Sequence, residues 1–280
     1  MQHDEFAKFF QQYSANVDNA DNSYYWKLSD QVILELIRTY IPASEVGSSS
    51  VVLDAGGGTG RWIVKLSQVY DCRFHLYDLS EHMLERAHSN LSAAGIEDRV
   101  QVTMGDLCDM HYVAEESVDH VVSIYGPLSF IDEPERAVAE IARVLKPGGR
   151  AMLMSHGYYN SLASKIAAGI DPAQLLTMCE TSTVKWADHV PILRTYSAAD
   201  MEALFEAAGM AVVATHGVTS LIEPGPEDFD PTNVARSAVS TRLEDDPEFF
   251  ATVLELELRY GGLPAVVNRG TNLIAVGEKR

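Results

Sequence analysis

A cluster of glycines early in the chain constrains the fold more than any other feature. The segment VVLDAGGGTG, residues 51–60, places four glycines among five residues directly after an apolar, β-branched run that ends in an acid. Glycine adopts left-handed backbone angles without a Cβ penalty, so this cluster predicts a tight turn at the end of a strand. The missing side chains also let a ligand approach the backbone closely. The segment therefore predicts a strand followed by a ligand-binding turn.

Strand-like and helix-like segments alternate along the rest of the chain. A helix is expected over residues 29–41 with Ser29 as its N-cap, and another over 134–145, which begins at Pro134 and ends at KPGG. Such alternation is typical of parallel strands with crossover helices, and so of a doubly wound, Rossmann-like α/β sheet. The strand-like runs are residues 51–55, 74–77, 100–104, 118–124, 150–155, 210–215 and 273–276.

Length and charge limit the classes of function. The chain has 280 residues, of which 46% are hydrophobic, so it can bury one large core. Its 40 acids and 21 bases give a formal net charge of −19. A surface of this sign repels phosphate backbones, so neither nucleic acid nor an anionic membrane is an expected partner. Adaptation of the surface to a high-salt host stays open as a second explanation of the charge.

Cysteine usage and the N-terminal residues point to a cytoplasmic protein. The three cysteines, Cys72, Cys108 and Cys179, are far apart and form no CxxC pair, so neither a disulfide framework nor a metal site is expected. The first residues lack a basic start and an apolar core, and no apolar run approaches the ~18 residues that cross a bilayer. We therefore expect no membrane association, and a homodimer stays open.

The glycine spacing narrows the type of ligand. Gly56, Gly58 and Gly60 read G-x-G-x-G, and Arg61 stands where the dinucleotide fingerprint G-x-G-x-x-G needs its last glycine, which argues against NAD. Asp78 follows at the end of the next predicted strand, where a carboxylate can accept both hydroxyls of a ribose. The pattern favours a nucleoside ligand without a pyrophosphate.

Over about residues 50–156, these motifs together resemble the class I S-adenosylmethionine-dependent methyltransferases. The matching segments are LDAGGGTG, YDLS at 77–80, GDL at 105–107, SIYGPL at 123–128 and LKPGG at 145–149. The resemblance implies S-adenosyl-L-methionine as cofactor and a seven-stranded methyltransferase sheet with helical lid insertions. The cofactor-binding residues that it implies are Asp54, Gly56, Gly58, Gly60, Asp78, Leu79, Met83, Asp106, Leu107 and Tyr125.

Within that resemblance each motif has a role. The backbone of Gly56 and Gly58 lies against the methionyl and ribose parts while Asp54 braces the turn, and Asp78 binds the ribose hydroxyls. Leu79 and Met83 flank the adenine, although Met83 taken alone is better explained as a core residue. Asp106 receives the adenine amino group and the Leu107 amide faces the ring. A main-chain carbonyl near Tyr125 holds the methionine amine.

The acceptor is expected under a lid. In this fold the loops after strands five and six emerge on the cofactor side, and both are long here, at 157–196 and 220–271. A mostly apolar and aromatic lid suits a small molecule. The second insertion is acidic, which is explained either by a solvent-exposed face or by a cationic acceptor. The substrate residues expected from this reasoning are Tyr125, Tyr158, Tyr159, Trp186 and His189.

The chain is accordingly divided into a core and its coverings. The expected parts are an N-terminal helical cap at 1–45, a cofactor-binding core at 46–156, a lid insertion at 157–196, a core helix and strand at 197–219, a second lid insertion at 220–271 and a last core strand at 272–280.

The expected reaction is methyl transfer to a small molecule. Displacement at a sulfonium methyl needs alignment and a dry pocket, so a base is optional and the acceptor atom, O, N, S or C, is not resolved. For a hydroxyl acceptor, His156 after the fifth strand is the first candidate base, and His189, His216 and Tyr125 follow. The alternative interpretation is that His156 is a histidine packed within a loop and has no catalytic role. A non-catalytic module that binds a nucleoside or S-adenosylmethionine is the alternative function, and a dehydrogenase is a more distant one.

Overall fold

The computed structural model describes residues 9–10, 23–186, 190–229 and 236–280. Its centre is a twisted sheet in which five parallel strands lie in the order β3-β2-β1-β4-β5. Beyond β5 the sheet continues with β9, which is antiparallel to β5, and then β8, which is antiparallel to β9. The strands are β1 (Val51–Ala55), β2 (Arg73–Asp78), β3 (Val100–Met104), β4 (Val118–Ser123), β5 (Leu145–Gly157), β8 (Met210–Val218) and β9 (Asn272–Lys279).

The strand order reverses at β1. The chain moves outward from β1 to β2 and β3, then returns to place β4 and β5 on the other side of β1. In doubly wound sheets, ligands bind outside the carboxyl ends of the strands at such a reversal. The glycine turn, which follows Ala55 directly, stands at this point. The doubly wound α/β fold expected from the alternating segments is confirmed.

Helices cover both faces of the sheet and divide the core in two. On one face, α2 (Tyr24–Tyr40), α3 (Arg61–Leu66) and α4 (Glu81–Ala93) pack in an apolar cluster that includes Ile33, Ile37, Ile63 and Leu66. On the other, α5 (Pro134–Val144) and α8 (Ala198–Ala207) contribute Val138, Ile141 and Phe205. The apolar spacing within each helix places these side chains on one stripe. Short 3-10 turns lie at η2 (Ala43–Glu45), η3 (Glu97–Arg99) and η4 (Pro127–Phe130).

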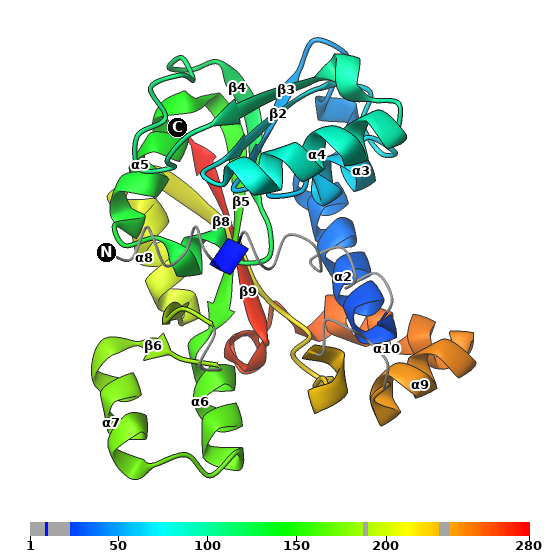
Figure 1. Ribbon diagram of the computed structural model, residues 1–280, viewed down its shortest axis with the longest axis vertical. Coiled ribbons are helices and arrows are strands. Elements are labelled where there is room, and N and C mark those ends of the chain that lie inside the picture. The colour runs from blue at the N-terminus through cyan, green and yellow to red at the C-terminus, as the bar shows by residue number, and fades with distance from the viewer. Residues whose placement is uncertain (1–8, 11–22, 187–189, 230–235) are drawn as a thin grey trace.

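The two insertions lie past the tip of β5 in the view of Figure 1. The first forms α6 (Tyr158–Ala167), α7 (Pro172–Thr181) and a small hairpin of β6 (Thr183–Val184) and β7 (Leu193–Tyr196), whose second strand pairs with the end of β5. The second forms η5 (Pro226–Phe229), α9 (Ala238–Asp245), α10 (Pro247–Tyr260) and η6 (Val267–Arg269). Helices α9 and α10 pack beside α2, and α6 and α7 lie apart from them (Figure 1).

Several local expectations are wrong. Helix α2 begins at Tyr24, so Ser29 is a buried residue within it and not its N-cap. Helix α5 ends at Val144, just before KPGG, as expected, but KPGG itself lies inside β5, where the register passes from Val118–Leu145 to His120–Arg150 and leaves a bulge. Strand β9 runs antiparallel to its neighbours, whereas alternation along the chain predicted parallel strands. Among the described residues, no helix is long and apolar enough to span a membrane.

Candidate functional site

The glycine turn is held between the second strand and the loop after β4. Gly56, Gly58 and Gly60 have φ of +73°, +53° and +71°, which only glycine adopts without strain. The Gly56 amide donates a hydrogen bond of 2.7 Å to the carbonyl oxygen of Tyr77. A Cβ on Gly56 would lie 2.6 Å from Cβ of Pro127. The turn therefore packs directly against the β4 loop.

Asp54 supports this turn from below. A Cβ on Gly57 would lie 2.6 Å from Cγ of Asp54, so the two residues are in contact. Asp54 is 2% exposed, and its Oδ2 has no hydrogen-bond partner among the described residues. Burial, and to a lesser extent the charge of Asp78, raise the pKa of the Asp54 carboxyl to about 7. Close to neutral pH, this carboxyl is therefore divided between its charged and protonated forms.

Asp78 closes the turn from the tip of β2. Its Oδ2 accepts a hydrogen bond of 2.9 Å from the Gly58 amide, and its Oδ1 accepts one of 2.8 Å from the Ser80 amide. Burial raises the pKa of Asp78, and these amides oppose that rise. Ser80 caps α4 by accepting a hydrogen bond from the Met83 amide, and Met83 Sδ lies 3.8 Å from where a Cβ on Gly58 would stand. Gly58, Asp78 and Met83 thus face one another.

The end of β3 completes this side of the site. Asp106 Oδ1 accepts a hydrogen bond of 2.8 Å from the Cys108 amide, which forms a tight local turn. Leu107 is buried, with Cδ1 3.7 Å from the Cβ position of Gly56. Leu79, just after Asp78, is 44% exposed. Leu107 therefore packs against the glycine turn, and Leu79 stands exposed beside Asp78.

Tyr125 joins the β4 loop to α2. Its φ is +60°, and its amide donates a hydrogen bond to Met154 Sδ at 3.2 Å. Its hydroxyl donates one of 2.5 Å to Asp30 Oδ1, and Asp30 also forms an ion pair with Arg61. Burial, together with the charge of Asp30, raises the pKa of Tyr125 well above its ordinary value. Because its hydroxyl is engaged under α2, this phenol is not a free base at the site.

Sequence reasoning missed Asp30. An acid within the apolar spacing of α2 was the available signal, since such a residue needs a partner when it is buried. Trp26 packs edge-on against Tyr125, with ring centroids 5.9 Å apart, and against Phe229 of the second insertion at 5.7 Å. Its indole N–H donates to the carbonyl oxygen of Asp228. These contacts link α2, the β4 loop and the second insertion.

His156 lies at the end of β5 against the other side of the β4 loop. Its Nε2 is 3.5 Å from where a Cβ on Gly126 would stand, and its amide donates a hydrogen bond of 3.0 Å to Ser129 Oγ. Its ring makes no hydrogen bond to the residues that the structure describes. Burial lowers the pKa of His156 to about 4. The imidazole is therefore neutral at physiological pH.

The other expected acceptor-site residues fall in different surroundings. Tyr158 and Tyr159 start α6, where Tyr159 is 54% exposed. Trp186 packs with a small cluster made by Met178, Val184, Leu193 and Phe130. His189 lies outside the described residues. His216 accepts or donates a 2.7 Å hydrogen bond with the Tyr40 hydroxyl and packs against Gly262, so its ring is already engaged.

Comparisons with known proteins agree with this arrangement. Residues 52–149 match the family described as a methyltransferase domain. Methyltransferase GfsG of Streptomyces halstedii is 27% identical over 186 residues, which are 65% of this chain and 60% of that protein. Residues 52–149 therefore form a methyltransferase domain, and the comparisons support a class I S-adenosylmethionine-dependent methyltransferase. The family match supports S-adenosylmethionine as the cofactor of this domain.

Two further similarities show how widely this domain is used. The tRNA 5-carboxymethoxyuridine methyltransferase of Escherichia coli K12 is 31% identical over 130 residues, which are 45% of this chain and 48% of that protein. The crystal structure of the [4+2]-cyclase SpnF has a TM-score of 0.64 at 17% identity and covers 98% of this chain and 95% of its own. The methyltransferase thus spans 60% or less of the curated relatives named here.

The residues at the glycine turn fit this cofactor. Gly58 leaves open backbone opposite Met83, because its Cβ position has no described neighbour closer than 3.8 Å. Asp78 presents a carboxylate at the tip of β2, and Asp54 keeps an unpaired oxygen beneath the turn. A carboxylate beside bare backbone amides is the donor and acceptor set that a ribose needs.

Proposed function

We propose that this methyltransferase transfers the methyl group of S-adenosylmethionine to a small-molecule acceptor, with the acceptor bound between the β4 loop and the first insertion. The contact between Gly56 and Pro127 carries the proposal. The β4 loop packs on the glycine turn through Pro127 and on His156 through Gly126, only one residue away. A ligand on the turn and an acceptor near His156 would therefore be neighbours across this loop.

Each part of the cofactor site has a proposed role. Asp78 holds the ribose hydroxyls, Gly56 and Gly58 leave room for the ligand, and Gly60 starts the helix behind the turn. Leu79, Met83, Asp106 and Leu107 form the adenine side. Asp54 braces the turn through Gly57, and the carbonyl of Tyr125 receives the methionine amine. When bound, S-adenosylmethionine supplies a sulfonium-activated methyl group.

We assign His156 to the acceptor. Because its pKa is about 4, the ring is neutral and can accept a hydrogen bond from a hydroxyl or amine of the acceptor. Alignment of this group with the methyl carbon accelerates an in-line displacement even if the ring removes no proton. His156 therefore acts first as an aligning group.

The insertions serve as the lid of this site. We propose the division of the chain that its sequence indicates, with a core at 46–156, 197–219 and 272–280, a lid at 157–196 and 220–271, and a cap at 1–45. Trp186 and Phe130 belong to one apolar cluster, which ties the first insertion to the β4 loop. Trp26 ties the second insertion to Tyr125. Water exclusion by such a lid strengthens polar interactions at the reacting atoms. Tyr158, Tyr159 and His189 are the other residues assigned to the acceptor side.

The net charge of −19 favours a small molecule over a nucleic acid as acceptor, although one relative is named a tRNA methyltransferase. The test is incubation with trideuteromethyl-labelled S-adenosylmethionine and either a pool of small metabolites or total tRNA. Mass spectrometry then locates the label. Label in a small molecule supports the proposal, and label in tRNA contradicts it. Cofactor binding without any labelled product would instead indicate the non-catalytic binding module.

A further inference from the structure

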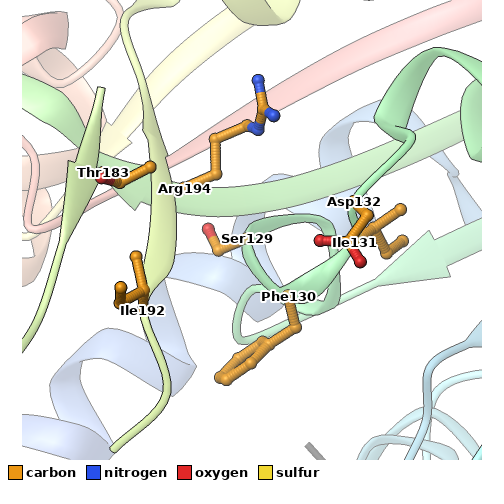
Figure 2. Close-up of a pocket in the computed structure, with 7 residues that line it drawn as sticks. All are labelled: Ser129, Phe130, Ile131, Asp132, Thr183, Ile192 and Arg194. Carbon is orange, nitrogen blue, oxygen red and sulfur yellow. The ribbon is translucent and has the colours of Figure 1, made fainter. Parts of the chain in front are cut away.

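A cavity of about 110 Å³ lies between the β4 loop and the hairpin of the first insertion. Figure 2 shows its two sides, with η4 and the residues after it facing the paired strands β6 and β7. Cavities of roughly 150 Å³ hold a benzene ring, so this one has room for the end of a small organic molecule. Its lining residues are Ser129, Phe130, Ile131, Asp132, Thr183, Ile192 and Arg194.

One wall of this cavity belongs to the loop that touches both halves of the proposed site. Ser129 is 2% exposed, and its Oγ accepts the hydrogen bond from the His156 amide. The Cα of Thr195, next to Arg194, pairs with that of His156 across the β5–β7 ladder. One wall of the cavity therefore contacts His156 directly through Ser129. On the other wall, Arg194 is the neighbour of the residue that pairs with His156.

Arg194 is the cation that lines the cavity, and this residue is exposed to solvent at the cavity's edge. In the described part of the chain its guanidinium forms no ion pair and no hydrogen bond, whereas arginines such as Arg61 and Arg143 are paired with acids. Acids outnumber bases by 40 to 21, so partners are plentiful. Asp132 lines the same cavity and has an interaction of its own. A planar guanidinium without a partner is suited to a carboxylate, which it binds through two parallel hydrogen bonds.

The other side chains define the rest of the ligand. Phe130, Ile131 and Ile192 are apolar, and Ile192 is 50% exposed. Thr183 and Ser129 add hydroxyls that can accept or donate hydrogen bonds. The cavity thus combines one cation with apolar walls, the chemistry of a carboxylate joined to a hydrocarbon or aromatic group.

We propose that this cavity is the acceptor pocket and that Arg194 selects acceptors which carry a carboxylate next to an apolar group. The inference rests on the proposed function and deepens it, since it replaces the cationic acceptor that the acidic second insertion had left open.

The binding test uses benzoate as the probe and benzyl alcohol as its neutral control, followed by chemical-shift titration of the backbone amides of Ile131 and Thr183. Benzoate is expected to shift both amides. Arg194→Gln should weaken the binding of benzoate about tenfold, as expected for loss of a charge-assisted hydrogen bond. The same variant should not change the response to benzyl alcohol.

Arg136→Gln is the matched control, because Arg136 is exposed on α5 and pairs with Glu133 outside the cavity. Equal benzoate affinity in wild type, R194Q and R136Q overturns the proposal, as does the absence of any shift at Ile131 and Thr183. The trideuteromethyl screen separates the two levels. If all labelled products are neutral or cationic, the carboxylate assignment is overturned and methyl transfer stands. If no product is labelled, the proposed function is contradicted, and the benzoate titration still decides whether the cavity binds a carboxylate.

Discussion

Asp78 and Gly58 are joined by a hydrogen bond of 2.9 Å from the Gly58 amide to Asp78 Oδ2. This bond ties the tip of β2 to the middle of the glycine turn, so one carboxylate both shapes the turn and faces the ligand. The stability of the turn and its affinity for the cofactor therefore depend on the same side chain.

Asp78→Ala is expected to weaken the binding of S-adenosylhomocysteine by about 10- to 100-fold, since hydrogen bonds to a charged group contribute ~1.5–3 kcal/mol. Met83→Ala should have a smaller effect, because it removes only an apolar contact near Gly58. Calorimetric titration of both variants measures the difference. Equal affinities for the two variants would contradict the assignment of Asp78 to the ribose.

Gly57→Ala is expected to destabilise the protein by about 1–3 kcal/mol, the usual range for an overpacked core. Its Cβ would lie 2.6 Å from Cγ of the buried Asp54. Gly47→Ala is the matched control, because no atom lies within 4 Å of its Cβ position and its φ is not positive. Chemical denaturation of both variants gives the free energies of unfolding. A loss of stability in Gly47→Ala as large as in Gly57→Ala would argue against the contact.

Asp54 should make the stability of the unliganded protein depend on pH. Burial raises its pKa from 3.8 to about 7, so the folded state holds a proton that the unfolded state has released. The stability from this proton is fully present below pH ~4 and is lost as pH rises through 7. Asp54→Asn removes this loss, so its stability relative to wild type should rise between pH 5 and pH 8. Denaturation curves at the two pH values measure this change, and a constant difference would contradict the raised pKa.

His156 should titrate far below an ordinary histidine. The midpoint expected for its ring is about 4, because burial disfavours the charged form. Proton NMR of the imidazole measures it, with His156→Gln identifying the resonance. A midpoint near 6.5 for His156 would mean that the ring is hydrated and not buried.

Trp186→Ala should separate cofactor binding from turnover. The ring belongs to the lid cluster and not to the glycine turn, so S-adenosylhomocysteine affinity should stay within about threefold, under ~0.7 kcal/mol. Methyl transfer to the acceptor should fall by much more, because the lid excludes water and aligns the acceptor. Single-turnover rates with saturating cofactor measure the loss. Full turnover in the variant would mean that the acceptor enters elsewhere.

The sequence by itself determined the parts of the protein that depend on neighbouring residues. Strand β1 has the predicted bounds, Val51–Ala55, and the glycine turn follows it. Asp78 ends β2, and α5 begins at Pro134 as its sequence indicates. Each of these follows from backbone preferences and apolar spacing within a few residues, which the order of amino acids contains directly.

Tertiary structure alone decided the contacts between distant segments. The antiparallel insertion of β9 between β5 and β8, the pairing of β7 with β5 and the hydrogen bond from Tyr125 to Asp30 join residues far apart in the chain. The start of α2 at Tyr24 also depends on tertiary contacts, because Tyr25 is buried and its hydroxyl donates to Thr219. No local pattern specifies these partners. Their choice follows from which buried surfaces and polar groups satisfy one another once the sheet has formed.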